Sequence, residues 1–298
     1  MTEVATYYED VAAPPMPVAR HGRGAGFWAY LCVALSLAVV FVLPIIWAIL
    51  RSFQPARLSS LAPQSGDFTH MTLANYHAVS HGLYDVLPNL VNSVIVGLGT
   101  ALLTTVVATL AGYGLAKFRF RGSGLVFGVI LLALMIPFQA VLTPLYLELS
   151  DLHLTNNLIG LILVYTTFNL PFGVFVMRNT FQQVPQELVE SARVDGAGFM
   201  FTLMRVMRPL IVPGLATAAM YAFLYAWTEL LQAVTFVQSP DKLTLPARLY
   251  EVTTSTYGSI NNAYLSAGVV LAMVPCVLLY FALQRYYVQG MMSGAVKG

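Results

Sequence analysis

Charged side chains are scarce in this sequence. Asp, Glu, Lys and Arg make up 9% of the 298 residues, whereas hydrophobic residues make up 58%, and the mean hydropathy is +0.72. Because about a quarter of the residues in a typical soluble domain are charged, this composition argues against a soluble protein and predicts a chain embedded in a lipid bilayer. The net charge of +2 is too small to indicate nucleic acid as a partner.

Cysteines and catalytic motifs are also few. Cys32 and Cys276 both lie in apolar runs, where a thiol behaves as a small hydrophobic group, so no disulfide framework is predicted. No Gly-Lys dipeptide occurs, which excludes a Walker-type phosphate loop for ATP. His70, His77 and His81 are spaced by seven and four residues without a nearby cysteine, a pattern that favours solvated loop positions over a metal site. We therefore predict no catalytic, cofactor or metal site in this chain.

Long apolar runs are the main feature that is present. A helix needs about 20 residues to cross roughly 30 Å of hydrocarbon, and six windows of this kind follow one another along the chain. Their approximate bounds are 27–50, 88–116, 124–147, 158–177, 210–231 and 264–286. The predicted fold class is an all-α integral membrane protein with six transmembrane helices.

The predicted organisation has three parts. Residues 1–26, which include the sequence AAPPMP, are expected to be a disordered cytoplasmic segment. Residues 27–286 form the six-helix membrane domain, and residues 287–298 form a cytoplasmic tail. A cleavable signal would have a basic start and a shorter apolar core, so the first span is predicted to be permanent.

Basic residues predict the orientation of the chain, because cytoplasmic loops retain Lys and Arg. If the N-terminus is inside, all but four of the 15 basic residues lie on the cytoplasmic side. The four on the outer side are Arg51, Arg57, Lys242 and Arg248. Both termini are therefore predicted to be cytoplasmic.

A polar segment, residues 178–209, separates the fourth and fifth predicted spans on the cytoplasmic side. Pro185 suits the first turn of a helix, where its missing N–H would be unpaired anyway, and Glu187 favours the positive end of the helix dipole. A short helix is expected to run from there to about Asp195.

Two pairings are expected within this short helix. Leu188 and Ala192, four residues apart, share one face, and Glu190 lies three residues before Arg193, with which it could form an ion pair.

A glycine turn and a second helix complete the polar segment. Gly196 and Gly198 permit a left-handed or otherwise tight turn. The second helix is predicted to have an apolar stripe beside a narrow polar ridge. The stripe consists of Phe199, Leu203 and Val206, and the ridge of Thr202, Arg205 and Arg208. A rigid helix–turn–helix of this kind suits docking into another protein; the alternative is a helix lying in the lipid headgroups.

This segment resembles the EAA loop of ATP-binding cassette (ABC) importer permeases. Glu190-Ser191-Ala192, three residues, Gly196, nine residues and then Val206-x-Arg208-Pro209 is similar to the family pattern of Glu-Ala-Ala, three residues, Gly, nine residues and Ile-x-Leu-Pro. Ser191 and Arg208 depart from that pattern. Further stretches, among them GYGLAKFRFRG (112–122), MIPFQAVLTPLY (135–146) and SGAVKG (293–298), look like the maltose-type second permease of the carbohydrate branch.

The resemblance implies a division of labour among subunits. Such a chain is a multi-pass permease of a prokaryotic inner membrane, and it forms half of the pathway together with a second permease subunit. A dimer of ATP-binding cassette ATPase subunits uses Mg-ATP beneath the membrane, and an extracytoplasmic solute-binding protein delivers the substrate. The chain itself is then no enzyme.

The resemblance also suggests roles for individual residues. Those expected to couple to the ATPase are Glu187, Glu190, Ser191, Ala192, Asp195, Gly196, Arg205 and Pro209. Gly294, Lys297 and Gly298 in the tail are expected to contact the ATPase subunits, with simple disorder of the tail as the alternative.

Polar and aromatic residues near the spans give two further sets of candidates. Those for the substrate pathway are Asn92, Gln139, Asn169, Trp227 and Glu229; hydrogen bonds between helices would explain most such residues equally well. By the same resemblance, Tyr250, Tyr257 and Asn261 in the outer loop 232–263 are expected to contact the binding protein. Ordinary interfacial tyrosines are the alternative there.

Other function classes fit less well, and the substrate stays open. An embedded enzyme would need a catalytic set that the five histidines do not supply. A secondary transporter or channel would place charges deep in its spans and would need no docking segment. The substrate is expected to be a sugar or oligosaccharide, or alternatively glycerol-3-phosphate or a glycerophosphodiester. A phosphate would favour Arg or Lys facing the cavity, and none is evident in the spans.

Overall fold

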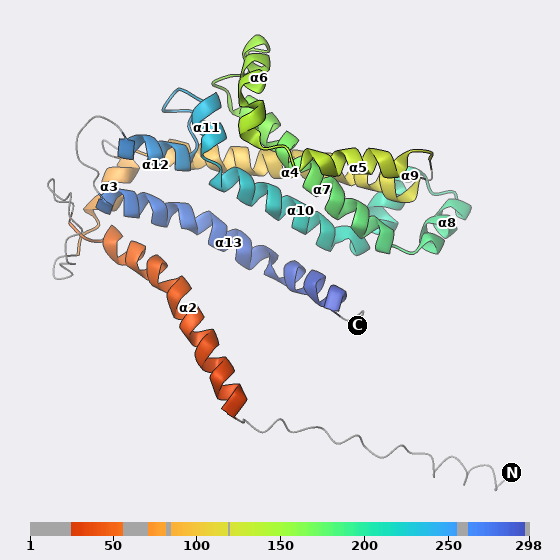
Figure 1. Cartoon of the computed structure of the whole chain (residues 1–298), viewed down its shortest axis with the longest axis horizontal. Helices are drawn as coiled ribbons and strands as arrows, with labels where there is room; N and C mark the ends of the chain where they lie inside the picture. The colour runs from red at the N-terminus through yellow and green to blue at the C-terminus, as the bar shows by residue number, and fades with distance from the viewer. Residues whose placement is uncertain (1–24, 56–70, 82–84, 119, 255–261, 296–298) are drawn as a thin grey trace, which may run out of the picture. The chain divides into compact units, whose positions relative to one another are not determined.

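The computed structural model describes residues 25–55, 71–81, 85–118, 120–254 and 262–295. Within these ranges the regular structure is helical, without strands (Figure 1). The elements are α2 (Ala25–Ser52), α3 (Ala74–His81), α4 (Leu87–Lys117), α5 (Ser123–Ala133), α6 (Phe138–Asp151), α7 (Leu158–Gln183), α8 (Gln186–Val194), α9 (Phe199–Phe201), the π-helix η1 (Thr202–Met207), α10 (Arg208–Thr228), α11 (Leu231–Phe236), α12 (Leu245–Thr254) and α13 (Asn262–Ala295).

The chain divides into two compact units, Met1–Trp47 and Ala48–Gly298. Most of α2, an apolar helix with Pro44 inside it, belongs to the first unit. The second unit contains α3 to α13. Its last helix continues to Ala295 and therefore includes most of the predicted tail 287–298.

In the described part of the chain, five helices are long and apolar enough to cross a membrane, and six candidate spans result if α5 and α6 together count as one. The five are Gly26–Ser52, Leu87–Lys117, Leu158–Gln183, Phe199–Thr228 and Asn262–Ala282. The predicted all-α membrane class is thus confirmed. The side of the membrane on which each terminus lies stays a prediction.

The third predicted span, 124–147, is bent by 95° between α5 and α6, which together count as one candidate span. Pro137 lies at the break and has an extended backbone, with φ −71° and ψ 137°. Proline has no N–H to continue a helical ladder, and it disfavours the helical conformation at the residue before it. Pro137 is the feature of residues 124–147 that indicates this break from the sequence.

Close contact between α4 and α7 forms the centre of the second unit, and α10 packs against both. A Cβ atom added to Gly112 of α4 would lie 2.7 Å from Cβ of Met177 and 2.8 Å from the backbone nitrogen of Arg178. A Cβ atom added to Gly173 of α7 would lie 2.9 Å from Cβ of Ala108. Small residues let the two backbones approach closely, which is the usual basis of helix association in lipid.

Helices gather at both ends of this bundle. At one end α8 and α9 lie beside the end of α4, and at the other end α3 and α12 pack against its beginning (Figure 1). The buried cluster at the α8 end contains Tyr113, Phe181, Val189, Leu203 and Met207. The segment between α7 and α10 is therefore packed onto the bundle.

We expect Gly112→Ala to destabilise the protein, because the backbone of α7 would have to move away. The expected loss is about 1–3 kcal/mol, as for other overpacked sites. Gly114→Ala is the matched control, since a Cβ atom there would have no neighbour within 4 Å. Thermal unfolding of the purified protein in detergent measures both. Equal melting temperatures for the two variants would contradict the close α4–α7 contact.

Candidate functional site

A buried turn connects α7 to α8. Val184 follows the last residue of α7 with an extended backbone (φ −75°, ψ 122°), the conformation that a residue before proline prefers. Its side chain is buried in the cluster with Phe181 and Tyr113. α8 begins directly after Pro185 with Glu187 in its first turn, where a carboxylate faces the positive end of the helix dipole. The expected short helix is present and ends at Val194, one residue before the predicted end.

α8 has one buried face and one exposed face. Val189 and Ala192 are 1% and 7% exposed and pack on the bundle, whereas Leu188 is 39% exposed. Leu188 and Ala192, predicted to share one face from their spacing of four, thus differ in exposure, and Val189 and Ala192 form the buried side of α8. The exposed face consists of Gln186, Glu187, Leu188, Glu190, Ser191 and Val194. The side chain of Arg193 lies outside the described residues, so its ion pair with Glu190 stays a prediction.

Gly196 ends α8 in a left-handed turn with φ +77°. The N–H of Ala197 donates to the carbonyl of Ala192 over 2.9 Å, and the N–H of Asp195 donates to the carbonyl of Ser191 over 3.0 Å. The first of these is the six-to-one bond of a Schellman cap. Gly198, by contrast, has an ordinary φ of −71° and begins the next helix. The left-handed turn that the sequence predicted is at Gly196.

The second helix of the segment is continuous with α10 and contains the π-helix η1. Leu203 and Met207, four residues apart, are buried, and Thr202 is also buried, with its hydroxyl donating to the carbonyl of Gly198 over 3.1 Å. The predicted polar ridge is therefore wrong at Thr202, whereas Arg205 and Arg208 are exposed as predicted. A π-turn holds about one residue more than an α-turn, so residues after it change face relative to an α-helical pattern.

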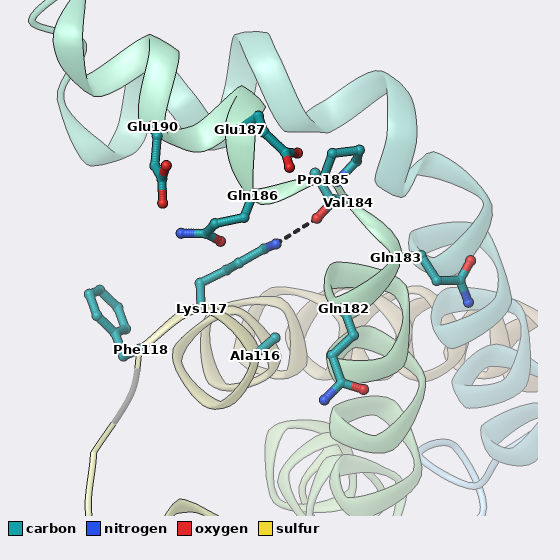
Figure 2. Close-up of a pocket in the computed structure, with 10 residues that line it drawn as sticks. All are labelled: Ala116, Lys117, Phe118, Gln182, Gln183, Val184, Pro185, Gln186, Glu187 and Glu190. Carbon is teal, nitrogen blue, oxygen red and sulfur yellow. Dashed lines mark hydrogen bonds between the residues drawn. The ribbon is translucent and has the colours of Figure 1, made fainter.

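A polar cleft of about 780 Å³ lies between the end of α4 and the start of α8 (Figure 2). Lys117 extends across it, and its Nζ donates to the carbonyl oxygen of Val184 over 2.7 Å. Glu187 and Glu190 line the cleft from α8. The remaining lining residues are Ala116, Phe118, Gln182, Gln183, Pro185 and Gln186. The cleft thus carries two carboxylates that a basic partner group could reach.

Seven of the eight residues predicted for coupling to the ATPase lie in or next to this exposed surface. Glu187, Glu190, Ser191, Asp195, Gly196, Arg205 and Pro209 are exposed. Ala192 is the exception, since it packs inward. The structure therefore brings the predicted set together at one end of the bundle.

The predicted pathway residues come from α4, α6, α7 and the C-terminal end of α10. Asn92 donates its side-chain N–H groups to the carbonyls of Asp241 over 2.8 Å and Leu243 over 3.1 Å. Gln139 is exposed near the start of α6. In the interior of α7, the Nδ2 of Asn169 donates to the carbonyl of Tyr165 over 2.7 Å. A role in the substrate pathway stays a prediction for all of these.

Trp227 and Glu229 lie where α10 ends. Trp227 is buried, stacks on Phe223 at 5.5 Å and donates from Nε1 to the carbonyl of Ala272 over 3.2 Å. The carboxylate of Glu229 accepts the N–H of Gln232 over 3.0 Å at the start of α11. Both side chains therefore have packing or capping contacts in addition to the predicted pathway role.

The remaining candidates lie toward the chain's last helices. Tyr250 is exposed on α12, and Gly294 belongs to the last turns of α13. Tyr257, Asn261, Lys297 and Gly298 lie outside the described residues. Among the described part of the chain, no three His, Cys, Asp or Glu side chains come together in a way that could hold a metal ion.

A comparison with protein families decides the classification. The model of the family "binding-protein-dependent transport system inner membrane component" matches residues 105–293, which include α8 and the Gly196 turn. The chain belongs to this family. Its members are membrane components of transport systems that depend on a binding protein, so the resemblance noted from the EAA-like segment is confirmed.

Several named members of the family are similar over most of the chain. The trehalose transport system permease protein SugB of Mycobacterium tuberculosis is 32% identical over 93% of this chain and 99% of its own length. The arabinooligosaccharides transport system permease protein AraQ of Bacillus subtilis is 29% identical over 89% of this chain and 93% of its own. The alpha-glucoside transport system permease protein AglG of Rhizobium meliloti is 34% identical over 76% of this chain and 60% of its own.

A solved structure shares the fold of this family member. It belongs to a bacterial ABC transporter involved in the import of the acidic polysaccharide alginate, and it matches with a TM-score of 0.76 at 21% identity, covering 88% of this chain and 96% of the other. At this identity the likeness concerns the fold alone.

Two residues that contact the α8 segment, Tyr113 and Lys117, were not predicted from the sequence. Both occur in the stretch GYGLAK, and their spacing of four places them on one face at the end of α4. That spacing was the available signal. The sequence alone could not show that Val184, 67 positions later, lies opposite Lys117.

We expect Val189→Asp to detach α8 from the bundle, because it would bury an uncompensated charge at a cost of about 3–5 kcal/mol. Leu188→Asp, one residue away on the exposed face, is the matched control and should leave the melting temperature nearly unchanged. Limited proteolysis of the α8 segment and thermal unfolding in detergent provide the measurements. Equal protease resistance of both variants would show that the buried face of α8 has been misassigned.

Proposed function

We propose that this chain is a permease subunit of an ABC importer for a sugar or oligosaccharide in a prokaryotic inner membrane. Relatives named for the transport of trehalose, arabinooligosaccharides and alpha-glucosides support a carbohydrate substrate. The helices that are long and apolar enough to span a membrane support a multi-pass location. In this proposal a second permease completes the pathway, and an external solute-binding protein delivers the substrate.

The exposed face of α8 carries the proposal that the chain docks onto a partner ATPase. α8 is fixed to the bundle by Val189 and Ala192, so its opposite face can bear load without the helix moving separately. Glu187 and Glu190 are exposed on α8 and line the cleft beside it. Carboxylates in this position suit charge-assisted hydrogen bonds with Arg or Lys of the partner. Mg-ATP binds in the ATPase dimer, and this chain holds no cofactor.

The remaining partner contacts follow from the same assembly. Gly294, Lys297 and Gly298 would contact the ATPase subunits from the tail, and Tyr250, Tyr257 and Asn261 would contact the binding protein from the opposite side. Both assignments rest on the resemblance to ABC importer permeases. Opposite sides of the membrane for the two surfaces are consistent with α8 and α12 lying at opposite ends of the bundle (Figure 1).

We expect Gly196→Val to uncouple ATP hydrolysis from uptake. A side chain at φ +77° costs about 1–2 kcal/mol in the left-handed region, and the strain would change the angle between α8 and the following helix. Gly198→Ala is the control, since Gly198 has an ordinary φ and open space around its Cα. Uptake per hydrolysed ATP, in complexes assembled with both partners, is the measurement. Normal coupling in Gly196→Val would refute the role of this turn.

The substrate class can be tested in liposomes that contain this chain, its partner permease, the ATPase and the binding protein. We expect Mg-ATP-dependent uptake of a radiolabelled disaccharide such as trehalose, with no uptake by this chain alone. Competition by unlabelled glycerol-3-phosphate distinguishes the alternative substrate class. Accumulation of solute by the isolated chain would contradict the proposed dependence on a separate ATPase.

A further inference from the structure

The last turn of α4 holds the chain segment that precedes α8. Lys117, the final residue of α4, donates from Nζ to the carbonyl of Val184 over 2.7 Å (Figure 2). Val184 and Pro185 are the only residues between α7 and α8. A charged donor on a backbone acceptor forms one of the stronger hydrogen bonds in proteins. Lys117 therefore fixes the entry to α8 against the end of α4.

Tyr113, one turn before Lys117, holds both sides of the α8 segment. Its buried ring lies edge-on to Phe181 of α7 at 5.4 Å and to Phe199 of α9 at 4.9 Å, with interplanar angles of 83° and 68°. Edge-to-face pairs at these distances are mutually attractive. Phe181 precedes α8 and Phe199 follows it, so α4 grips the α8 segment on both sides although it is not its neighbour in the chain.

α4 is also the least interrupted long helix of the second unit. Proline occurs inside α7 at Pro171, inside α10 at Pro213 and inside α13 at Pro275. The only proline of α4, Pro88, lies in its first turn, where proline does not break the ladder. The 31 residues of α4 extend over about 46 Å at the usual rise per residue. α4 is therefore the helix best suited to transmit a push without bending.

The first turns of α4 hold the loop between α11 and α12 at the opposite end of the bundle. The side chain of Asn89, buried, donates to the carbonyls of Pro240 over 2.8 Å and Leu243 over 2.9 Å. The hydroxyl of Ser93, also buried, accepts the N–H of Leu245 over 2.7 Å. Residues 240–245, termed loop 240–245, comprise the end of this connection and the first residue of α12.

We propose that α4 is a rigid rod that carries movement of α8 to loop 240–245 at the opposite end of the bundle. Tyr113 and Lys117 connect the rod to the α8 segment, and Asn89 and Ser93 connect it to the loop. The proposal rests on the proposed docking of α8 onto an ATPase. It adds that the movement passes through a helix that is not covalently adjacent to α8, whereas α7 and α10, which flank the segment in the chain, can bend at their prolines.

The first experiment measures uptake per hydrolysed ATP in reconstituted complexes. Lys117→Met removes one of the inner attachments and Asn89→Leu one of the outer ones. Each should lower the ratio by about tenfold, the order expected when a hydrogen bond that positions a moving part is lost. The double variant should be no worse than the lower single variant, because both attachments belong to one line of transmission. The proposal would be overturned if the loss in the double variant equals the product of the two single losses. A normal ratio in Lys117→Met would also overturn it.

Lys117→Arg is the conservative control, because a guanidinium also donates to a backbone carbonyl, and it should restore most of the ratio. Tyr113→Phe keeps the ring and should resemble the unaltered chain, whereas Tyr113→Leu should behave like Lys117→Met. Damage to folding alone would lower the amount of complex while leaving the ratio of the remaining complexes unchanged. That result in both Lys117→Met and Tyr113→Leu would also overturn the proposal.

A second measurement does not depend on the tolerance of these variants. Val194 on α8 is 88% exposed, and Asp241 is exposed on loop 240–245. The variants Val194→Cys and Asp241→Cys are combined after Cys32 and Cys276 have been replaced by Ser. The distance between spin labels at the two positions should be the same with and without Mg-ATP, while each label moves relative to one on α13. A change in the Val194–Asp241 distance would overturn the rod.

The two proposals fail in different ways. Disulfide cross-linking from Val194→Cys to a cysteine in the partner ATPase tests docking of α8 directly. Without any cross-link in the otherwise unaltered complex, the proposed docking is wrong. With a normal cross-link in Lys117→Met and a normal transport ratio, docking stands and the rod is wrong.

Discussion

The close approach of α4 and α7 is the constraint on which the rest of the bundle depends. At Gly112 no side chain separates the two backbones, and Gly173 meets Ala108 one to two turns away. Lipid offers no hydrophobic gain for bringing two apolar helices together, so close packing over small residues supplies the association. The short hydrogen bond from Lys117 to Val184 exists only because the two helices stay in this register. Wider separation would leave a lysine with no backbone partner and α8 without its anchor.

Polar side chains order the backbone at the end of the bundle opposite α8. Asn89 and Ser93 pair with the backbone of residues 240–245, and Asn156 pairs with Phe236, Ser239 and their neighbours. Irregular backbone at the edge of a membrane must be satisfied by protein, because lipid provides no donors or acceptors. These side chains therefore order loops that would otherwise have no reason to adopt one conformation.

The sequence predicted those features that depend on local chemistry. The apolar runs indicated the spans, and Gly196 indicated the left-handed turn, because few other residues adopt a positive φ at low cost. Prediction from the sequence failed where one composition is compatible with several local structures. An apolar run shows neither the break before Pro137 nor the bulge of η1, and helical spacing does not show which face of α8 is buried. The partners of Lys117 and Asn89 are distant in the chain, and only the folded arrangement shows them.

The extra residue held in η1 fixes the rotational phase between the α8 segment and α10. Each residue of an α-helix advances the side-chain direction by about 100°. Deletion of one residue within Thr202–Met207 would convert the π-turn into an ordinary α-turn, so the residues on either side would keep their directions. α4 contains no π-turn that could accommodate such a deletion, which would turn Gly112 away from Met177.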